Sequence, residues 1–148
     1  MNYYSLNKKA PNTTFKNAVV KGLAPDKGLY FPESIMPLSK DFFDNIEQLT
    51  NAEIAYETIK QFVLPEIPEV ELKNIVEDTL SFEFPIVELN ENISTLELFH
   101  GPTMAFKDVG ARFMARCLGY FNQDNTNEVT VLVATSGDTG GAVANGFL

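Results

Sequence analysis

One lysine stands where an amine could do chemistry. Lys107 follows Phe106 and the nearby Met104 and precedes Asp108, at a point where a strand-like run gives way to a helix-like one. A lysine ammonium is inert near neutral pH, because its reference pKa is about 10.4, but apolar surroundings or a nearby positive charge lower that pKa. The freed amine forms Schiff bases, and pyridoxal 5'-phosphate is the commonest biological aldehyde to hold it. Taken alone, the residue is more simply a surface lysine paired with Asp108 or with the start of the helix.

A glycine-rich turn is the second segment that could do chemistry. Residues 136–141, Ser-Gly-Asp-Thr-Gly-Gly, follow an apolar run and precede a predicted helix. Backbone N–H groups and hydroxyls in such a turn converge on one point and suit a phosphate or a carboxylate, although an ordinary strand-to-helix turn is an equally good interpretation. The Gly-Lys-Ser/Thr ending of a P-loop is missing. The similarity to a serine-protease nucleophile segment also fails, since threonine replaces the serine and a chain with one histidine has no obvious triad.

The single histidine and the single cysteine predict no metal site. His100 could bind a substrate phosphate or carboxylate, or it could hydrogen-bond a backbone carbonyl, which is the commoner role. No second histidine or cysteine lies near it at ligand spacing. Cys117 falls in a predicted helix beside apolar neighbours, so we expect a core residue.

Composition narrows the class of protein. The chain has 148 residues, 45% of them hydrophobic, which is enough to bury a core. Asp and Glu outnumber Lys and Arg by 20 to 11, and this acidic balance argues against a nucleic-acid partner. No run has the length of a membrane-spanning helix, and the N-terminus lacks the features of a signal peptide. Together with the lone cysteine, these features predict a cytoplasmic protein with no membrane partner.

Residues 1–82 are predicted to form a small, mainly helical unit. A first helix is expected over residues 13–22, with a threonine as N-cap and Gly22 in the left-handed conformation at its end. A second would begin after Ser39. Two more are expected over residues 51–64, ended by Pro65, and over residues 68–82, with Pro68 in the first turn.

Residues 83–148 carry a different pattern, typical of an α/β unit. Strands are expected over residues 86–89 and 93–99, and a helix over residues 108–122 with Asp108 as N-cap. The β-branched run 129–134 predicts a buried parallel strand, and a helix is expected from Ala142. Because the chain stops at Leu148 inside this predicted helix, without a cap, we expect a piece of a longer protein.

Three motifs in this order resemble the threonine synthase family, in the branch that carries an additional N-terminal domain. The first comprises Tyr3-Tyr4-Ser5 with residues 22–33, Gly-Leu-Ala-Pro-Asp-Lys-Gly-Leu-Tyr-Phe-Pro-Glu. The second is residues 98–113, which contain Lys107, and the third is residues 134–142. The resemblance runs through the whole chain, and the order of the three motifs makes it specific. Family members continue well past Leu148.

The resemblance implies a pyridoxal-phosphate enzyme of the tryptophan-synthase β-like fold (fold type II), which converts O-phospho-L-homoserine and water to L-threonine and phosphate. Lys107 would hold the cofactor as a Schiff base and then move protons as a base. Phe106 and Asp138 would lie at the cofactor. The substrate carboxylate would lie on the loop residues Ser136, Gly137, Thr139 and Gly140, and the candidates for the substrate phosphate are Thr103, His100 and Arg112.

Two features qualify this expectation. The wider superfamily has an asparagine where this chain has Asp138, and a carboxylate there would repel the cofactor's phenolic oxygen unless the two share a proton. In this fold the loop that binds the cofactor phosphate, and the partner of the pyridine nitrogen, come later in the chain. We therefore expect the 148 residues alone to bind cofactor poorly and not to turn over.

Other interpretations stay open. A sister enzyme of the same superfamily, such as a threonine or serine dehydratase or a cysteine synthase, would use the same lysine. A non-catalytic homologue could keep the fold without the chemistry. An unpartnered half-sheet would also expose a strand edge and apolar surface, so self-association is a further expectation.

Overall fold

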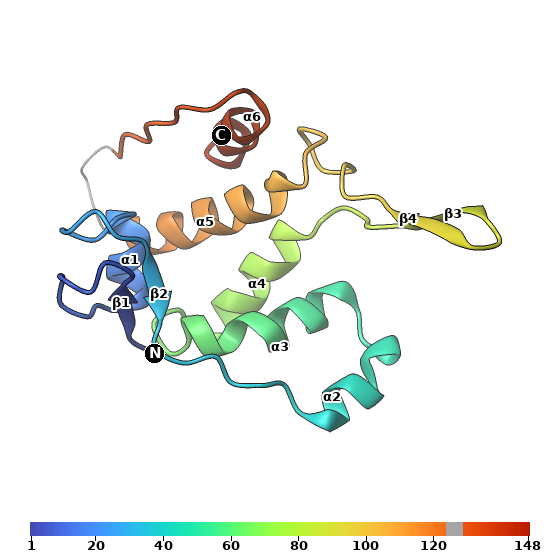
Figure 1. Cartoon of the computed structure of the whole chain (residues 1–148), viewed down its shortest axis with the longest axis horizontal. Helices are drawn as coiled ribbons and strands as arrows, with labels where there is room; N and C mark the ends of the chain where they lie inside the picture. Colours follow the sequence, from blue (N-terminus) through green and yellow to red (C-terminus); the bar gives the residue numbers. More distant parts are fainter. Residues whose placement is uncertain (124–128) are drawn as a thin grey trace. The chain divides into compact units, whose positions relative to one another are not determined.

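The computed structural model describes residues 1–123 and 129–148, which form two compact units, Met1–Glu77 and Asp78–Leu148. The structure is mixed α/β: helices predominate, and two small two-stranded antiparallel sheets accompany them (Figure 1). Each unit contains one of these sheets. In the described ranges no helix is both long and apolar enough to cross a membrane.

The sheet of the first unit joins the N-terminus to the 22–33 motif. Strand β1 (Tyr3–Ser5) pairs antiparallel with β2 (Tyr30–Pro32). The Asp26 carboxylate fastens the loop between them, accepting hydrogen bonds from Ser5 Oγ at 2.6 Å, Lys9 N at 2.9 Å and Gly28 N at 3.0 Å. These bonds, the one from Ser5 above all, lower the pKa of Asp26. Neither strand is predicted from the sequence, because three residues are too few to show an alternating pattern.

The helices of the first unit begin and end largely at the predicted signals. Thr14 caps α1 (Phe15–Lys21) by accepting a hydrogen bond from Asn17 N, and Gly22 follows with φ 69°. Ser39 is the N-cap that was predicted, but the helix after it is short and divides in two. The remaining elements are α2 (Lys40–Asp44), the 3₁₀ helix η1 (Ile46–Gln48), α3 (Asn51–Val63) and α4 (Glu69–Thr79).

The core of the first unit lies around the turn between α3 and α4. Val63, Ile67 and Leu72 have no exposed surface. The Tyr3 hydroxyl donates to the Phe62 carbonyl at 2.8 Å, so β1 is fastened to the end of α3. Burial, with a smaller contribution from the charge of Glu66, raises the pKa of Tyr3 to about 12.

The second unit holds the residues predicted to do chemistry. Strands β3 (Ile86–Asn90) and β4 (Ile93–Leu96) form an antiparallel hairpin. Helix α5 (Lys107–Asn122) packs against α6 (Asp138–Gly146), as Figure 1 shows. Small buried side chains allow this close approach, namely Ala111, Ala115 and Ala142.

Two details of the predicted α/β unit are wrong. Residues 129–134 have no regular secondary structure, because no strand among the described residues supplies a hydrogen-bonding partner for them. The strands predicted near residues 86–89 and 93–99 do form, as β3 and β4, although β4 ends at Leu96. The last helix begins at Asp138, four residues earlier than predicted, because Thr135 satisfies N–H groups of its first turn.

The start of α5 also differs from the prediction. Phe106 occupies the N-cap position and makes no side-chain cap, and Asp108 lies inside the first turn. The Asp108 carboxylate does not cap the helix, because it is turned back toward the preceding loop.

The core of the first unit leads to a stability prediction for α4. Replacing Leu72, which is 0% exposed, with alanine leaves a cavity, so we expect the free energy of unfolding to fall by about 2–5 kcal/mol. The matched control is Val70→Ala on the same helix, where the side chain is 68% exposed and the change should stay within about 0.5 kcal/mol. Urea unfolding followed by circular dichroism measures both. Equal losses in the two variants would contradict this account of the core.

A second prediction concerns Cys117 in α5. Its side chain is 0% exposed, and burial raises the pKa of the thiol to about 12. Because the thiolate is the reactive form, we expect the folded chain to resist a disulfide reagent at pH 8. In guanidinium chloride the single thiol should react rapidly, since its pKa returns to about 8.5. Fast reaction in the absence of denaturant would show that this part of the core opens.

Candidate active site

Lys107 is the first residue of α5, and its amine lies beside an aromatic ring. Nζ is 5.0 Å from the centroid of the Phe106 ring, a distance at which a cation interacts with the face of the ring. None of the ion pairs among the described residues includes Lys107. The simple alternative, a lysine neutralised by its neighbour Asp108, is therefore not what the structure contains. The Lys107 side chain is half-buried.

The carboxylate of Asp108 is committed to the loop that precedes α5. Thr103 donates two hydrogen bonds to it, from its backbone N to Oδ2 at 2.9 Å and from its hydroxyl to Oδ1 at 2.5 Å. The loop is closed further by bonds from Met104 N to Gly101 O and from Asp108 N to Ala105 O, both 3.0 Å. Asp108 is completely buried. This role is not evident from the sequence, because an aspartate near the start of a predicted helix is normally interpreted as its N-cap.

Gly101 allows the loop to approach the carboxylate this closely. A Cβ atom placed on Gly101 would lie 2.4 Å from Asp108 Oδ2 and 2.9 Å from Asp108 Cβ. Met104, in the same loop, has φ 56°, a conformation that residues other than glycine adopt at a cost. The loop therefore has a shape that few sequences permit.

The glycine turn 136–140 stands at the N-terminus of α6, as expected for an anion site. Thr135 Oγ1 accepts hydrogen bonds from Gly137 N and Gly140 N, each at 3.0 Å. Two of the N–H groups expected to meet a substrate carboxylate thus already have a partner within the chain. Among the described residues, no hydrogen-bond partner is found for the Asp138 carboxylate, which is exposed. Thr135 was not among the predicted site residues.

His100, a candidate for the substrate phosphate, is engaged by its neighbours on the chain. Its Nε2 lies 2.7 Å from Glu97 Oε2, and its ring stacks on Phe99 with the centroids 4.9 Å apart. Thr103, a second candidate, gives its hydroxyl hydrogen to Asp108.

Arg112, the third candidate, is fastened to the end of α4 and the residues that follow it. Its Nη2 donates to the Asp78 carbonyl at 2.6 Å and to Ser81 Oγ at 3.0 Å, and its guanidinium carbon lies 6.0 Å from the Phe82 ring centroid. Its Nε is buried and has no hydrogen-bond partner among the described residues. Within the same ranges, no hydrogen bond or ion pair joins the three candidates to one another or to Lys107.

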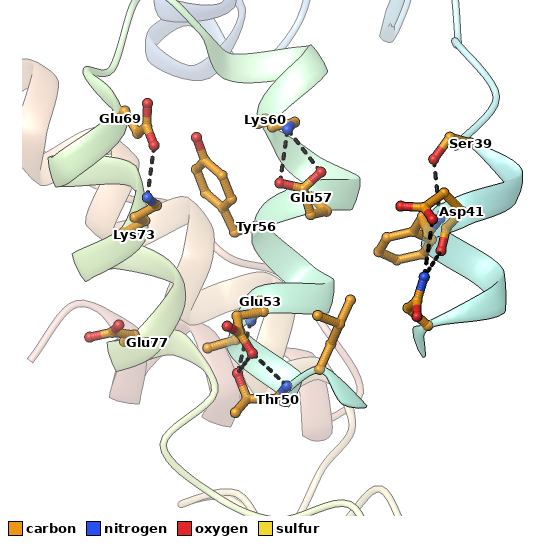
Figure 2. A pocket seen from close by; sticks show the side chains of 14 residues that line it. Ser39, Asp41, Thr50, Glu53, Tyr56, Glu57, Lys60, Glu69, Lys73 and Glu77 are labelled. Carbon is orange, nitrogen blue, oxygen red and sulfur yellow. Dashed lines mark hydrogen bonds and ion pairs between the residues drawn. The ribbon is translucent and has the colours of Figure 1, made fainter. Parts of the chain in front are cut away.

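A groove of the first unit contains none of the predicted site residues. Figure 2 shows this groove of about 740 Å³, into which helices α2, α3 and α4 contribute side chains. Its lysines are paired with acids, Lys60 with Glu57 at 2.8 Å and Lys73 with Glu69 at 2.7 Å, and both lie near the Tyr56 ring. Burial and the charge of Glu69 raise the pKa of Tyr56. Because these two cations are neutralised within the chain, the residues that line the groove offer no free cationic group to an anionic ligand.

Comparison with known proteins identifies the family. The family model described as the threonine synthase N terminus matches residues 2–80, which is more than half of the chain. The chain belongs to the threonine synthase family. The resemblance found in the sequence motifs is thereby confirmed.

Relatives and solved structures agree with this family. The chain is 41% identical over 148 residues to the threonine synthase of Buchnera aphidicola subsp. Baizongia pistaciae, covering 99% of this chain and 34% of the relative. The crystal structure of threonine synthase from Escherichia coli superposes with a TM-score of 0.91 at 38% identity, covering 99% of this chain and 34% of that one. A structure described as PLP-bound threonine synthase from Brucella melitensis gives 0.90 at 35% identity, with 99% and 33% covered. The chain thus spans about a third of the length of these threonine synthases.

The packing of the loop before α5 predicts opposite effects for two glycines. Gly101→Ala would force a methyl group into the Asp108 carboxylate, so we expect the chain to lose about 1–3 kcal/mol of stability. Gly110→Ala, on α5, meets nothing within 4 Å and should gain about 0.5–1 kcal/mol, because alanine restricts the unfolded chain and favours a helix. Thermal unfolding of the two variants beside the parent checks the signs. A tolerated alanine at position 101 would show that the loop has another conformation.

Proposed function

We propose that this chain supplies the lysine of a threonine synthase, which converts O-phospho-L-homoserine and water to L-threonine and phosphate with pyridoxal 5'-phosphate as cofactor. The observation that carries the proposal is the amine of Lys107 at the start of α5, within the second family motif, which forms no ion pair with any described residue. A relative with a similar structure is described as binding PLP, which supports the cofactor assignment.

Two residues of this segment are chemically suited to that cofactor. Lys107 offers an amine that no described acid neutralises, and Phe106, which is largely exposed, offers an aromatic face beside it. When bound, the cofactor supplies an electron sink that makes protons on the substrate carbon skeleton acidic. In this proposal Lys107 removes and returns those protons, since one amine can act as a base and then as an acid.

The turn at the N-terminus of α6 is proposed to orient the substrate carboxylate. The remaining N–H groups of its first turn and the hydroxyls of Ser136 and Thr139 are suitable donors, with Gly137 and Gly140 allowing close approach. Thr135 keeps this turn in shape from within. Asp138 would lie at the cofactor, where its carboxylate would repel the phenolic oxygen unless the two share a proton.

The substrate phosphate finds no preformed cationic site among the three candidate residues. His100 and Thr103 each already contact a carboxylate, and Arg112 is hydrogen-bonded to Asp78. Arg112 Nε has no hydrogen-bond acceptor among the described residues, but this atom is buried. We propose Arg112 as the phosphate ligand, on the condition that its side chain leaves Asp78 when substrate binds.

We also propose that residues 83–148 begin the catalytic domain of the tryptophan-synthase β-like fold. The junction with the N-terminal domain would fall after residue 82, between α4 and β3. In this proposal the 129–134 run joins a parallel sheet only when further strands are present, in agreement with its unpaired state in this structure.

A fusion protein tests the proposed reaction. The C-terminus of this chain would be joined to the remaining two thirds of the Escherichia coli threonine synthase, and the product supplied with O-phosphohomoserine, threonine and O-acetylserine in parallel. We expect phosphate release from the first substrate alone, and no release by the 148-residue chain on its own. Ammonia formed from threonine would instead identify a dehydratase, and turnover by the chain alone would refute the expectation that it is incomplete.

Lysine variants of the same fusion identify the reacting amine. Lys107→Ala should lower phosphate release by at least about 100-fold, because the general base is lost. Lys40→Ala, a change to an exposed lysine of the first unit, is the matched control and should have no effect. Borohydride reduction with the cofactor, followed by peptide mass mapping, should place a phosphopyridoxyl group on Lys107. Absence of that adduct would favour a non-catalytic homologue.

A further inference from the structure

We infer that Asp108 is a positioning residue for Lys107: its buried carboxylate clamps the loop of residues 101–106 to the first turn of α5 and thereby fixes where the lysine stands. The inference rests on the proposed role of Lys107 and deepens it. In this inference Asp108 does not contact the reacting atoms; it fixes the position of Lys107, which does.

Both oxygens of the Asp108 carboxylate are used within the loop. Asp108 is 0% exposed, and a carboxylate buried to this degree is tolerated only where donors surround it. Both oxygens are occupied by Thr103, through the backbone N–H and the hydroxyl. The first turn of a helix adds a favourable field, because its N–H groups point toward its N-terminus. These bonds and this field stabilise the carboxylate in its position, and an ion pair with Lys107 does not contribute.

The hydrogen bonds of Asp108 run in the opposite direction to those of a usual N-cap. A usual N-cap stands before the helix and reaches forward to N–H groups in the first turn. Here the N-cap residue Phe106 makes no side-chain bond, and Asp108 reaches back five residues from inside the helix to Thr103. The bond from Asp108 N to Ala105 O closes the same loop from the backbone side. Lys107 lies within the closed segment, between the loop and the residue that holds it.

The clamp also holds strain in the loop. Met104 has φ 56°, a sparsely populated conformation that costs free energy, and Gly101 packs against the carboxylate at a distance that excludes any side chain. Without Asp108 the loop has no comparable anchor among the described residues, since the hydrogen bonds of Thr103 and Met104 are formed within this loop or to Asp108. We conclude that loss of the carboxylate frees the residues that precede Lys107 and, with them, the first turn of α5.

Hydrogen exchange of the 148-residue chain, without any cofactor, tests the clamp directly. In Asp108→Ala and in Thr103→Val, exchange of the amides at positions 103, 104 and 108 should quicken about tenfold or more, as expected when a hydrogen bond to a charged group is lost. Thr103→Ser keeps both donors and should stay within about twofold of the parent. Asp44→Ala, at an exposed aspartate of the first unit, is the matched control. If Asp108→Ala does not fold, Thr103→Val is the variant that tests the clamp.

A second readout separates positioning of the lysine from simple support of the loop. The same variants are treated with excess pyridoxal 5'-phosphate and borohydride over a range of pH, and the share of phosphopyridoxyl on Lys107 is compared with that on the exposed lysines. We expect Thr103→Val to lower that share several-fold and Thr103→Ser to restore it.

The outcomes are distinguishable. Unchanged exchange in both clamp variants overturns the inference, and so does quicker exchange with an unchanged share on Lys107. If the parent chain and its fusion to the Escherichia coli remainder place no adduct on Lys107 at all, the proposed function fails, and the exchange experiment alone decides whether the clamp exists.

Discussion

The buried carboxylate of Asp108, next to Lys107, is the constraint on which the candidate site depends. The Asp108 carboxylate requires donors, and the Thr103 backbone and hydroxyl meet that requirement only if residues 101–106 fold back over the start of α5. Gly101 is needed for the approach, and Met104 accepts a strained φ to complete it. The same arrangement keeps this carboxylate from serving as counter-ion to the neighbouring lysine. The requirement of the Asp108 carboxylate for hydrogen-bond donors therefore shapes the loop, and it leaves Lys107 without an ion pair to Asp108.

The two glycine-containing loops of the second unit follow a common plan. In each, one side chain accepts a hydrogen bond from at least one backbone N–H group at the start of a helix or in the loop before it. Asp108 does this for the loop before α5, and Thr135 does it for the turn before α6. A loop that is satisfied from within can hold its shape without a ligand, as a site that must be preorganised requires. The cost is that fewer donors remain for the ligand itself.

Sequence reasoning succeeded where the deciding forces are local. Thr14, Ser39 and Gly22 lie at the helix ends that their chemistry predicted, since a cap acts on residues only two or three positions away. It failed where a distant partner decides. Strands β1 and β2 are created by pairing across some 25 residues, and residues 129–134 lack, within the described ranges, the partner that their composition anticipates. The role of Asp108 was hidden for a related reason, because the same residue type at a helix start predicts a cap, and only the folded loop shows that it faces backward.

The unpaired run 129–134 has a consequence for the way such a chain is made. Its residues are mostly apolar, four of the six are β-branched, and Leu132 is 91% exposed. No strand of the described residues pairs with its backbone, and an exposed extended segment of this kind can add to a strand of another copy. The same residues that could extend a sheet would therefore also favour aggregation while they remain uncovered. A chaperone that masks such a segment during folding would suppress that side reaction.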